Sequence, residues 1–218
     1  MAKSTHILFI GNSFTNRNDL PGMLARMAGA GVPARVVETE RVIANGMALK
    51  THWTHGEARA AIGKRKWDYV VLQEQSTLPL KNRAKMHESV RLFVEEIRAA
   101  GAEPVLYMTW ARLNAWERQD ELADAYLSIG KELKAKVVPV GTAWKLAFER
   151  VPGIVLHDKD GSHPNPLGTY LGACVFYAAL FGGNPVGIEP GAGVAKYAAE
   201  AVREIQEIAW ATVGKSGK

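Results

Sequence analysis

The segment His6-Ile-Leu-Phe-Ile-Gly-Asn-Ser13 joins a short apolar run to a turn, and this pattern indicates the fold class. Four consecutive apolar residues without polar alternation are typical of a strand that is buried on both faces of a sheet. Glycine, asparagine and serine form turns, and a segment of helical period follows them over residues 20–30. Strand, turn and helix in this order predict the first βα unit of a parallel sheet.

Similar short apolar runs recur along the chain, separated by longer segments of helical period. We expect strands at 6–10, 34–43, 69–72, 105–108 and 137–140, and helices at 20–30, 48–62, 82–100, 117–135, 166–181 and 194–212. The second run alternates polar and apolar residues, as a strand nearer the sheet edge does. The pattern predicts a three-layer α/β/α sandwich with a five-stranded parallel sheet, formed by one domain over residues 1–218.

The composition fits a globular protein and gives little sign of nucleic-acid binding. Of 218 residues, 47% are hydrophobic and 22% are charged, which is enough apolar material for a sizeable core. The formal net charge is +5, but the basic residues form no stripe interleaved with aromatic residues. The one dense basic run, Lys64-Arg65-Lys66, is interpreted as a solvated helix end. We therefore predict no nucleic-acid partner.

Cys174 is the only cysteine, so an intramolecular disulfide and a zinc site built from paired thiolates are both excluded. Its apolar neighbours predict a buried, inert thiol. The N-terminal apolar run of four residues is too short for a signal sequence or a membrane span. The sequence therefore predicts a cytoplasmic protein without a membrane partner.

Three polar segments carry residues that could do chemistry. They are Gly11-Asn-Ser-Phe-Thr15 after the first strand, Gln73-Glu-Gln-Ser76 after the third, and Asp160-Gly-Ser-His163 late in the chain. Ligands of open α/β sheets bind at the carboxyl ends of the strands. A serine there can attack an ester if a base takes its proton, and imidazole titrates near neutrality. Asp160 lies three residues before His163, so one helical turn would let its carboxylate orient the ring.

The segment from Ile7 to Ser13, Gly46 after the second strand, and Asp160-x-x-His163-Pro together resemble the SGNH hydrolases, the GDSL-type esterases and lipases. The resemblance covers roughly residues 6 to 182 in the family's block order. It implies that Ser13 is the nucleophile, His163 the base and Asp160 the orienting acid. It also implies that the N–H groups of Ser13 and Gly46 form two parts of an oxyanion hole. The substrate would be a small-molecule ester, and no metal or organic cofactor would be needed.

The chain departs from the family pattern in two places. Asn12 replaces the usual aspartate before the serine, and Leu72-Gln-Glu-Gln-Ser76 replaces the third-block Gly-x-Asn-Asp. Aligning Leu72 with the end of the family's third strand puts Gln75 where the asparagine would be. A glutamine amide can donate the same hydrogen bond, so we expect Gln75 to be the third oxyanion donor, with Gln73 as the alternative.

Further residues are expected around the site. We predict that the substrate contacts Asn12, Gln73, Trp110 and Arg112. Glu74 is expected to pair with a base such as Arg112.

Asp158 and the pair His52 and His55 could also take part in chemistry. Asp158 is the alternative orienting acid. His52 and His55 lie three apart on a predicted helix, where such pairs can bind a metal, but a solvated helix face is the favoured interpretation because no third ligand stands out.

Two alternatives to an active esterase stay open. In a flavodoxin-like module the first loop would bind a phosphate or flavin through backbone N–H groups. An inactive hydrolase fold would also explain the altered third block. For an active enzyme we expect a short acyl group, such as acetyl on a sugar.

Overall fold

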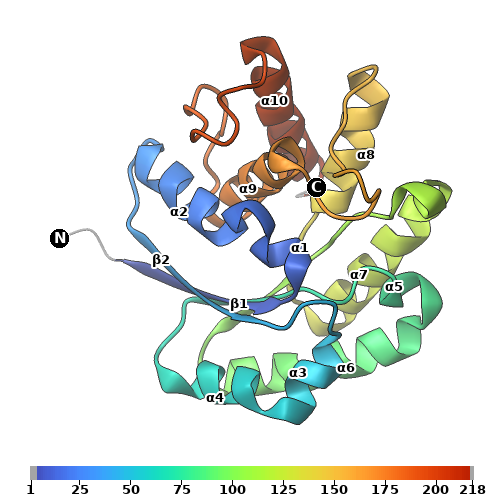
Figure 1. Ribbon diagram of the computed structural model, residues 1–218. Coiled ribbons are helices and arrows are strands. Elements are labelled where there is room, and N and C mark those ends of the chain that lie inside the picture. The colour runs from blue at the N-terminus through green and yellow to red at the C-terminus, as the bar shows by residue number, and fades with distance from the viewer. Residues whose placement is uncertain (1–3, 217–218) are drawn as a thin grey trace.

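The computed structural model describes residues 4–216. Five parallel strands form one sheet in the order β2-β1-β3-β4-β5. Helices cover both faces of this sheet (Figure 1). The predicted three-layer α/β/α sandwich is confirmed, and β2 lies at an edge as its alternating pattern indicated.

The strands are β1 Thr5–Gly11, β2 Val37–Ile43, β3 Tyr69–Leu72, β4 Glu103–Tyr107 and β5 Lys136–Val138. The α-helices are α1 Ser13–Asn16, α2 Leu20–Ala30, α3 Leu49–His55, α4 Glu57–Lys64, α5 Leu78–Lys81, α6 Arg83–Ala99, α7 Gln119–Leu133, α8 Val140–Arg150, α9 Pro166–Phe181 and α10 Ala199–Ser216. Two 3₁₀ segments are η1 Arg17–Asp19 and η2 Leu113–Arg118.

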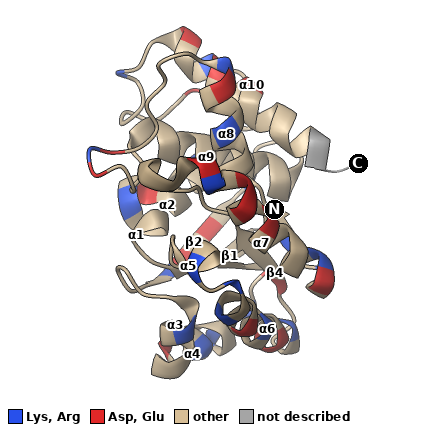
Figure 2. Ribbon diagram, turned by 90° about the vertical axis from the view of Figure 1, so that its right-hand side faces the viewer, with Lys and Arg blue, Asp and Glu red and all other residues tan. Residues whose placement is uncertain are grey.

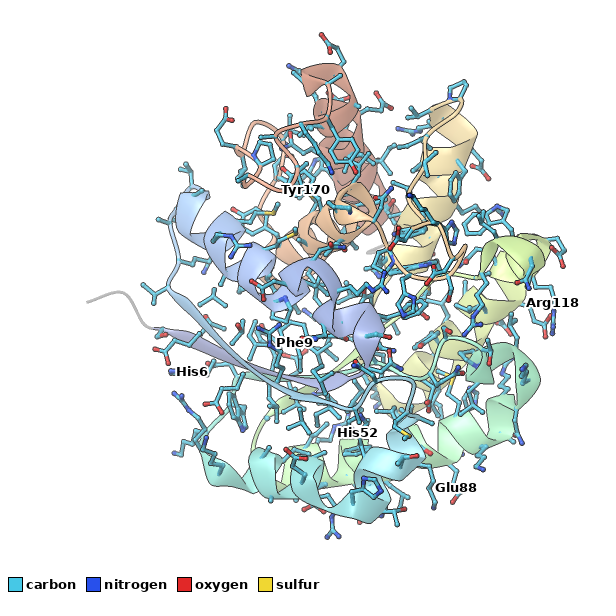
Figure 3. All side chains as sticks on the ribbon, in the orientation of Figure 1. His6, Phe9, His52, Glu88, Arg118 and Tyr170 are labelled. Carbon is cyan, nitrogen blue, oxygen red and sulfur yellow. The ribbon has the colours of Figure 1, made fainter. Side chains whose placement is uncertain are left out.

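Side chains of β1 alternate between two cores, one on each face of the sheet. Ile7 and Phe9 pack toward α2, α8, α9 and α10, whereas Leu8 and Ile10 pack toward α3, α4, α6 and α7. Figure 3 shows Phe9 on the first side and His52 of α3 on the second. All four β1 side chains are buried, and each contributes about 1.5–3 kcal/mol by leaving water. A strand covered on both faces needs apolar residues at successive positions, which explains the unbroken run in the sequence.

Two elements differ from the sequence prediction for reasons visible in the backbone. The helix expected over 48–62 is divided into α3 and α4 at Gly56, whose φ of +81° ends α3 while its N–H bonds to His52. The strand expected over 137–140 stops at Val138, and Val140 already begins α8. Val140 extends the strand pattern in the sequence, and Pro139, the single residue between the two elements, occupies the N-cap position of α8.

Helix α8 was not predicted, although the sequence carries its signal. Val140, Ala143, Trp144 and Ala147 are buried and spaced i, i+3, i+4 and i+7, the period of one helix face. The start of α10 was also misplaced: the segment from Gly191 to Tyr197 forms turns, and the helix begins only at Ala199.

Charged side chains are distributed in mixed signs over the surface. Figure 2 shows Lys and Arg interspersed with Asp and Glu rather than gathered in a band. Several are paired between α6 and α7, including Arg91 with Glu132 at 2.7 Å. Within residues 4–216, no helix has the length and apolar character to cross a membrane. Cys174 is buried as expected, and the cytoplasmic location stays a prediction.

The order of the strands determines where a ligand can bind. The chain leaves β1 for β2 on one side and returns to β3 on the other side of β1. The loops that follow β1 and β3 therefore diverge at the carboxyl ends of the strands and leave a crevice between them. The segments after β2 and β4 and the turn before α9 also reach this crevice.

Candidate active site

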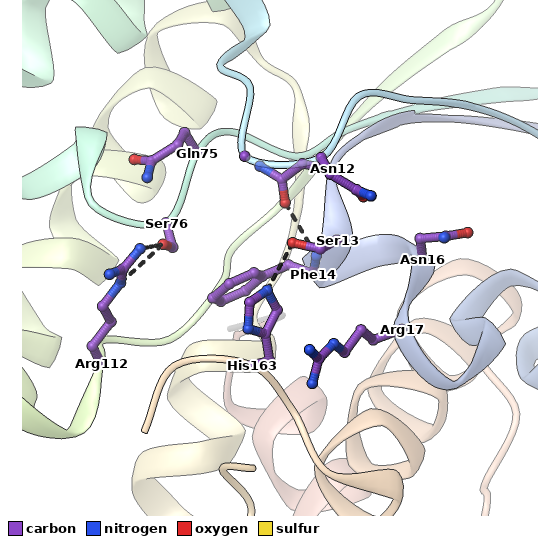
Figure 4. A pocket seen from close by; sticks show the side chains of 11 residues that line it. Asn12, Ser13, Phe14, Asn16, Arg17, Gln75, Ser76, Arg112 and His163 are labelled. Carbon is purple, nitrogen blue, oxygen red and sulfur yellow. Dashed lines mark hydrogen bonds between the residues drawn. The ribbon is translucent and has the colours of Figure 1, made fainter. Parts of the chain in front are cut away.

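Ser13 lies directly after β1, at the first position of the short helix α1. Asn12 caps this helix, because its side-chain oxygen accepts the N–H of Phe14 at 3.1 Å. The N–H of Ser13 has no acceptor inside the helix, since the first turn of a helix leaves its N–H groups free. The Ser13 hydroxyl lies 2.8 Å from Nε2 of His163 (Figure 4).

His163 and Asp160 belong to a turn between β-bridge partners His157 and Pro164, not to the helical turn expected from their spacing. One oxygen of Asp160 accepts the backbone N–H groups of Ser162 and His163, both at 2.9 Å. Its other oxygen lies 2.5 Å from Nδ1 of His163. The same carboxylate therefore fixes the turn and orients the ring.

The charge of Asp160 determines how the His163 ring is protonated. Desolvation opposes ionisation of Asp160, but hydrogen bonds from the ring and backbone of His163 and from the N–H of Ser162 hold its pKa well below its usual range. An ionised carboxylate only accepts hydrogen bonds, so the neutral ring carries its proton on Nδ1. Nε2 is then free to accept the proton of Ser13.

These residues open on a cleft of about 590 Å³. The cleft is lined by Asn12, Ser13, Phe14, Asn16, Arg17, Asn45, Gly46, Gln75, Ser76, Arg112 and His163. Figure 4 shows Gln75, Ser76 and Arg112 on one side of the Ser13–His163 pair, and Asn16 and Arg17 on the other. Asp158, the alternative orienting acid, lies 2.5 Å from Arg17 and makes no hydrogen bond to the His163 ring.

Gly46 and Gln75, which are expected to complete the oxyanion hole, both line the cleft. Gly46 has a φ of +73°, and a Cβ there would meet no heavy atom within 4 Å. The side-chain oxygen of Gln75 accepts from the N–H of Thr77 at 2.8 Å and of Leu78 at 3.1 Å. The NH₂ group of this amide has no hydrogen-bond partner among the described residues.

Asn12 borders the cleft but is 2% exposed, and protein groups occupy its amide. Its nitrogen donates to the carbonyl of Met47 at 3.0 Å, while its oxygen caps α1. Asn12 therefore joins the loop of Ser13 to the loop of Gly46. A positioning role explains these contacts better than the expected substrate contact.

The structure places Gln73 outside the cleft, so its predicted contact with substrate and its alternative role as oxyanion donor are wrong. The side chain is fully buried, and its oxygen accepts the N–H of Asn12 at 2.8 Å and the hydroxyl of Thr15 at 3.0 Å. Its nitrogen donates to the carbonyl of Glu74 at 2.5 Å. Gly11 makes this possible, because a Cβ there would lie 2.6 Å from the Gln73 oxygen. Gln73 thus holds the Ser13 loop from the interior of the protein through these hydrogen bonds.

Trp110 is also outside the cleft, contrary to prediction. Its ring is fully buried and stacks on Trp144 with centroids 3.8 Å apart, and on Phe14 at 5.0 Å. The indole N–H donates to the carbonyl of Ser162 at 3.0 Å. Trp110 therefore connects the core to the turn that carries His163.

Glu74 does not pair with Arg112 as expected, because its carboxyl points into the protein and is fully buried. It accepts the N–H groups of Leu49 at 3.0 Å and of Gln75 at 2.7 Å. Burial raises its pKa from 4.5 to about 7, although the two hydrogen bonds oppose the shift. The buried Glu74 carboxyl therefore holds the backbone of the segment that carries Gln75 from the interior side.

The predicted solvated face at His52 and His55 is wrong for His52. Its ring is 4% exposed, and Nε2 lies 2.8 Å from the carbonyl of Gly11. Burial lowers the pKa of His52, which favours the neutral ring with a proton on Nε2 for this carbonyl. His55, three residues later, is exposed, so the pair does not share a metal-binding face.

Sequence reasoning missed several cleft residues, among them Asn16, Arg17 and Ser76. Ser76 ends the Gln73–Ser76 segment after β3, so its place in the sequence already put it at the carboxyl edge of the sheet. Its hydroxyl accepts from Nε and Nη2 of Arg112 at 3.3 and 3.1 Å. Arg112 itself lies in the cleft as predicted.

Solved structures share this fold, whereas no protein-family model and no curated protein matches the sequence. A proposed SGNH hydrolase from Slackia heliotrinireducens is 26% identical, with a TM-score of 0.68, covering 82% of this chain and 100% of that one. A DUF4886 family protein from Bacteroides uniformis is 19% identical, with a TM-score of 0.79 and coverage of 99% and 97%. An acetylxylan esterase from Geobacillus stearothermophilus is 15% identical, with a TM-score of 0.64 and coverage of 83% and 97%. Sheet order, fold and these neighbours together show that the chain belongs to the SGNH hydrolase superfamily.

Proposed function

We propose that this protein is a serine esterase that cleaves oxygen esters at Ser13. The observation that carries the proposal is the unbroken hydrogen-bond chain from the Ser13 hydroxyl through the His163 ring to the Asp160 carboxylate. A serine hydroxyl is a weak nucleophile until a neighbouring base takes its proton, and this chain supplies both the base and its orienting acid.

The proposed reaction proceeds in two halves. His163 accepts the Ser13 proton on Nε2 as the serine oxygen attacks the ester carbonyl, and Asp160 stabilises the imidazolium that forms. The N–H groups of Ser13 and Gly46 and the amide of Gln75 would hold the oxyanion. His163 then protonates the leaving alcohol, and water attacks the acyl-serine by the same route. The proposed reaction requires no metal or organic cofactor.

A short acyl group on a polar alcohol is the proposed substrate class. The cleft lining is dominated by amides, hydroxyls and arginines, with Phe14 the one large apolar side chain among its described residues. A long acyl chain would find little apolar surface there. The name of one structural neighbour, an acetylxylan esterase, also supports an acetylated sugar.

A fluorophosphonate probe tests the proposal, because it reacts with a serine only when a base activates it. We expect wild-type protein to be labelled and Ser13→Ala to be unlabelled. Ser76→Ala is the matched control, since Ser76 is in the same cleft but contacts Arg112 rather than a base. Labelling that persists in Ser13→Ala would refute the nucleophile. Unlabelled wild-type protein would instead favour the inactive fold, and a bound flavin absorbance the flavodoxin-like module.

A further inference from the structure

Arg112 lines the cleft, and one edge of its guanidinium has no partner among the described residues. Its Nε and Nη2 each donate one hydrogen bond to Ser76, at 3.3 and 3.1 Å. A guanidinium has five N–H groups, so two on Nη1 and one on Nη2 remain. Within residues 4–216 none of these three has an acceptor in the protein. The free Nη1–Nη2 edge is the planar fork that binds a carboxylate through two parallel hydrogen bonds.

The other charged groups of the cleft are already neutralised. Arg17 lies 2.5 Å from Asp158, and the carboxylate of Asp160 is taken by the His163 ring and two backbone N–H groups. Glu74 directs its hydrogen bonds to backbone N–H groups in the interior. Among the described side chains, no carboxylate forms an ion pair with Arg112.

Most arginines of the described chain pair with a carboxylate, whereas Arg112 does not. Arg83 pairs with Asp124 at 2.6 Å, for example, and Arg118 pairs with Glu121 at 2.7 Å. Among the described residues, Arg35, Arg98 and Arg150 also lack an ion pair, but none of them lines the cleft. Arg112 is half-buried, as Arg83 is, and its only hydrogen-bond partner among the described residues is a neutral hydroxyl. Withdrawing a cation from water without a counter-charge is costly, and a carboxylate on a ligand would offset that cost.

Building on the esterase function, we propose that Arg112, held in place by Ser76, binds a carboxylate of the substrate, so that the preferred esters are anionic. One unpaired positive charge matches one carboxylate. The net charge of +5 adds a weak general attraction for such ligands. The carboxylate can belong to the alcohol part, as in an acetylated uronic-acid sugar, or to the acyl part, as in a half-ester of a dicarboxylic acid.

Two pairs of esters distinguish these sources. The first pair, the monoacetylated methyl glucuronide and methyl glucoside, differs by a carboxylate on the alcohol. The second pair, the 4-nitrophenyl half-ester of glutaric acid and 4-nitrophenyl valerate, differs by a carboxylate on the acyl group. For one pair we expect wild-type kcat/KM to favour the anionic ester by about tenfold to a hundredfold, the range for a hydrogen bond to a charged group.

Variants then assign this preference to Arg112. The anionic-to-neutral ratio should fall to about one or below in Arg112→Met, and Arg112→Lys should give an intermediate ratio because an ammonium lacks the planar fork. Arg203→Met is the control, since it removes the same charge from an exposed site on α10 and should keep the wild-type ratio. Ratios that are equal in wild type and Arg112→Met for both pairs would overturn the proposal.

A binding experiment separates this inference from the esterase proposal. The binding of glutarate and of methyl glucuronide to Ser13→Ala protein is measured by calorimetry. This measurement does not depend on ester hydrolysis. We expect one of the two ligands to bind Ser13→Ala saturably. Its affinity for Ser13→Ala/Arg112→Met should be at least tenfold lower, as expected for the loss of a hydrogen bond to a charged group. If wild type cleaves no ester but this binding is seen, the esterase proposal fails and the anion site stands. If there is neither cleavage nor Arg112-dependent binding, the anion site is refuted as well.

Discussion

The buried carboxyl of Glu74 accepts the backbone N–H of Leu49 at 3.0 Å. Leu49 begins α3, shortly after Gly46, and Glu74 follows β3, so this hydrogen bond joins the segments that lead to two of the proposed oxyanion donors. The same carboxylate oxygen also accepts the N–H of Gln75 at 2.7 Å. Glu74 is therefore a positioning residue, whose contacts keep Gly46 and Gln75 in a fixed relation.

Glu74 should make the stability of the protein depend on pH. Burial raises its pKa from 4.5 to about 7, so between these values the folded protein binds a proton that the unfolded chain has lost. Stability then falls as pH rises from about 4.5 to about 7 and is level above that range. This pKa shift corresponds to a loss of about 3 kcal/mol in the free energy of unfolding between about pH 4 and about pH 8. Glu74→Gln has no carboxyl to ionise and should not show this loss.

Urea unfolding over this pH range measures the effect of Glu74→Gln. The exposed Glu149→Gln is the control, and it should follow the wild-type pH profile. A difference between wild type and Glu74→Gln that does not change with pH would contradict the prediction.

Asp160→Asn should lower kcat by about 10⁴ with little loss of stability. The asparagine oxygen can still accept the N–H groups of Ser162 and His163, so the turn is kept. Its NH₂ group cannot accept from Nδ1, so the ring loses the tautomer that leaves Nε2 free for Ser13. Steady-state kinetics on an acetyl ester and thermal unfolding measure the two effects. Asp158→Asn is the matched control, and a comparable loss of kcat there would show that Asp160 has no special role.

Gln75→Glu should reduce kcat by about 10² to 10³ while KM changes little. The glutamate oxygen can still accept the N–H groups of Thr77 and Leu78, so the loop is kept, but no side-chain donor remains for the oxyanion. A carboxylate beside a developing negative charge adds repulsion. The expected signature is a kcat effect at unchanged thermal stability. Unaltered kcat would exclude Gln75 from the oxyanion hole.

Trp110→Phe should destabilise the protein without altering the affinity for a small ester. The substitution leaves the carbonyl of Ser162 without its indole donor, which costs about 1–3 kcal/mol, and weakens the stack on Trp144. Urea unfolding should detect this loss, whereas KM should stay within about twofold of wild type. Trp210→Phe, at an exposed ring, should change neither. A raised KM at unchanged stability would restore Trp110 as a substrate contact.

Much of the fold was predictable because local pattern and tertiary environment agree. β3 and α9 begin and end where predicted: Tyr69–Leu72 is an apolar run buried in the centre of the sheet, and α9 is apolar on nearly all sides because other helices surround it. Helix α8 was missed because Val140 continues the β-branched run of β5. Pro139, the one residue between them, fits a turn, the end of a strand or the start of a helix, so it does not mark the boundary by itself.

The candidate site was predictable in part, for a related reason. Ser13, Asp160 and His163 stand in recognisable motifs, and the structure brings them together. Gln73 and Gln75 have the same side chain two positions apart, and the sequence could not separate their roles. In an extended segment such residues leave the backbone on the same side, but the chain turns after β3. Gln73 consequently lies under the Ser13 loop while Gln75 lines the cleft.

Local sequence pattern is enough to predict the alternation of strands and helices, the parallel sheet and the identities of the proposed nucleophile, base and acid. These follow from periodicity and from local motifs, which are properties of neighbouring residues. The three-dimensional arrangement was needed to establish which side chains face the cleft, which are buried supports, and that Arg112 has no carboxylate partner among residues 4–216. Burial and pairing depend on residues far apart in the chain, such as Ser76 with Arg112 or Glu74 with Leu49, and no local pattern encodes those distances.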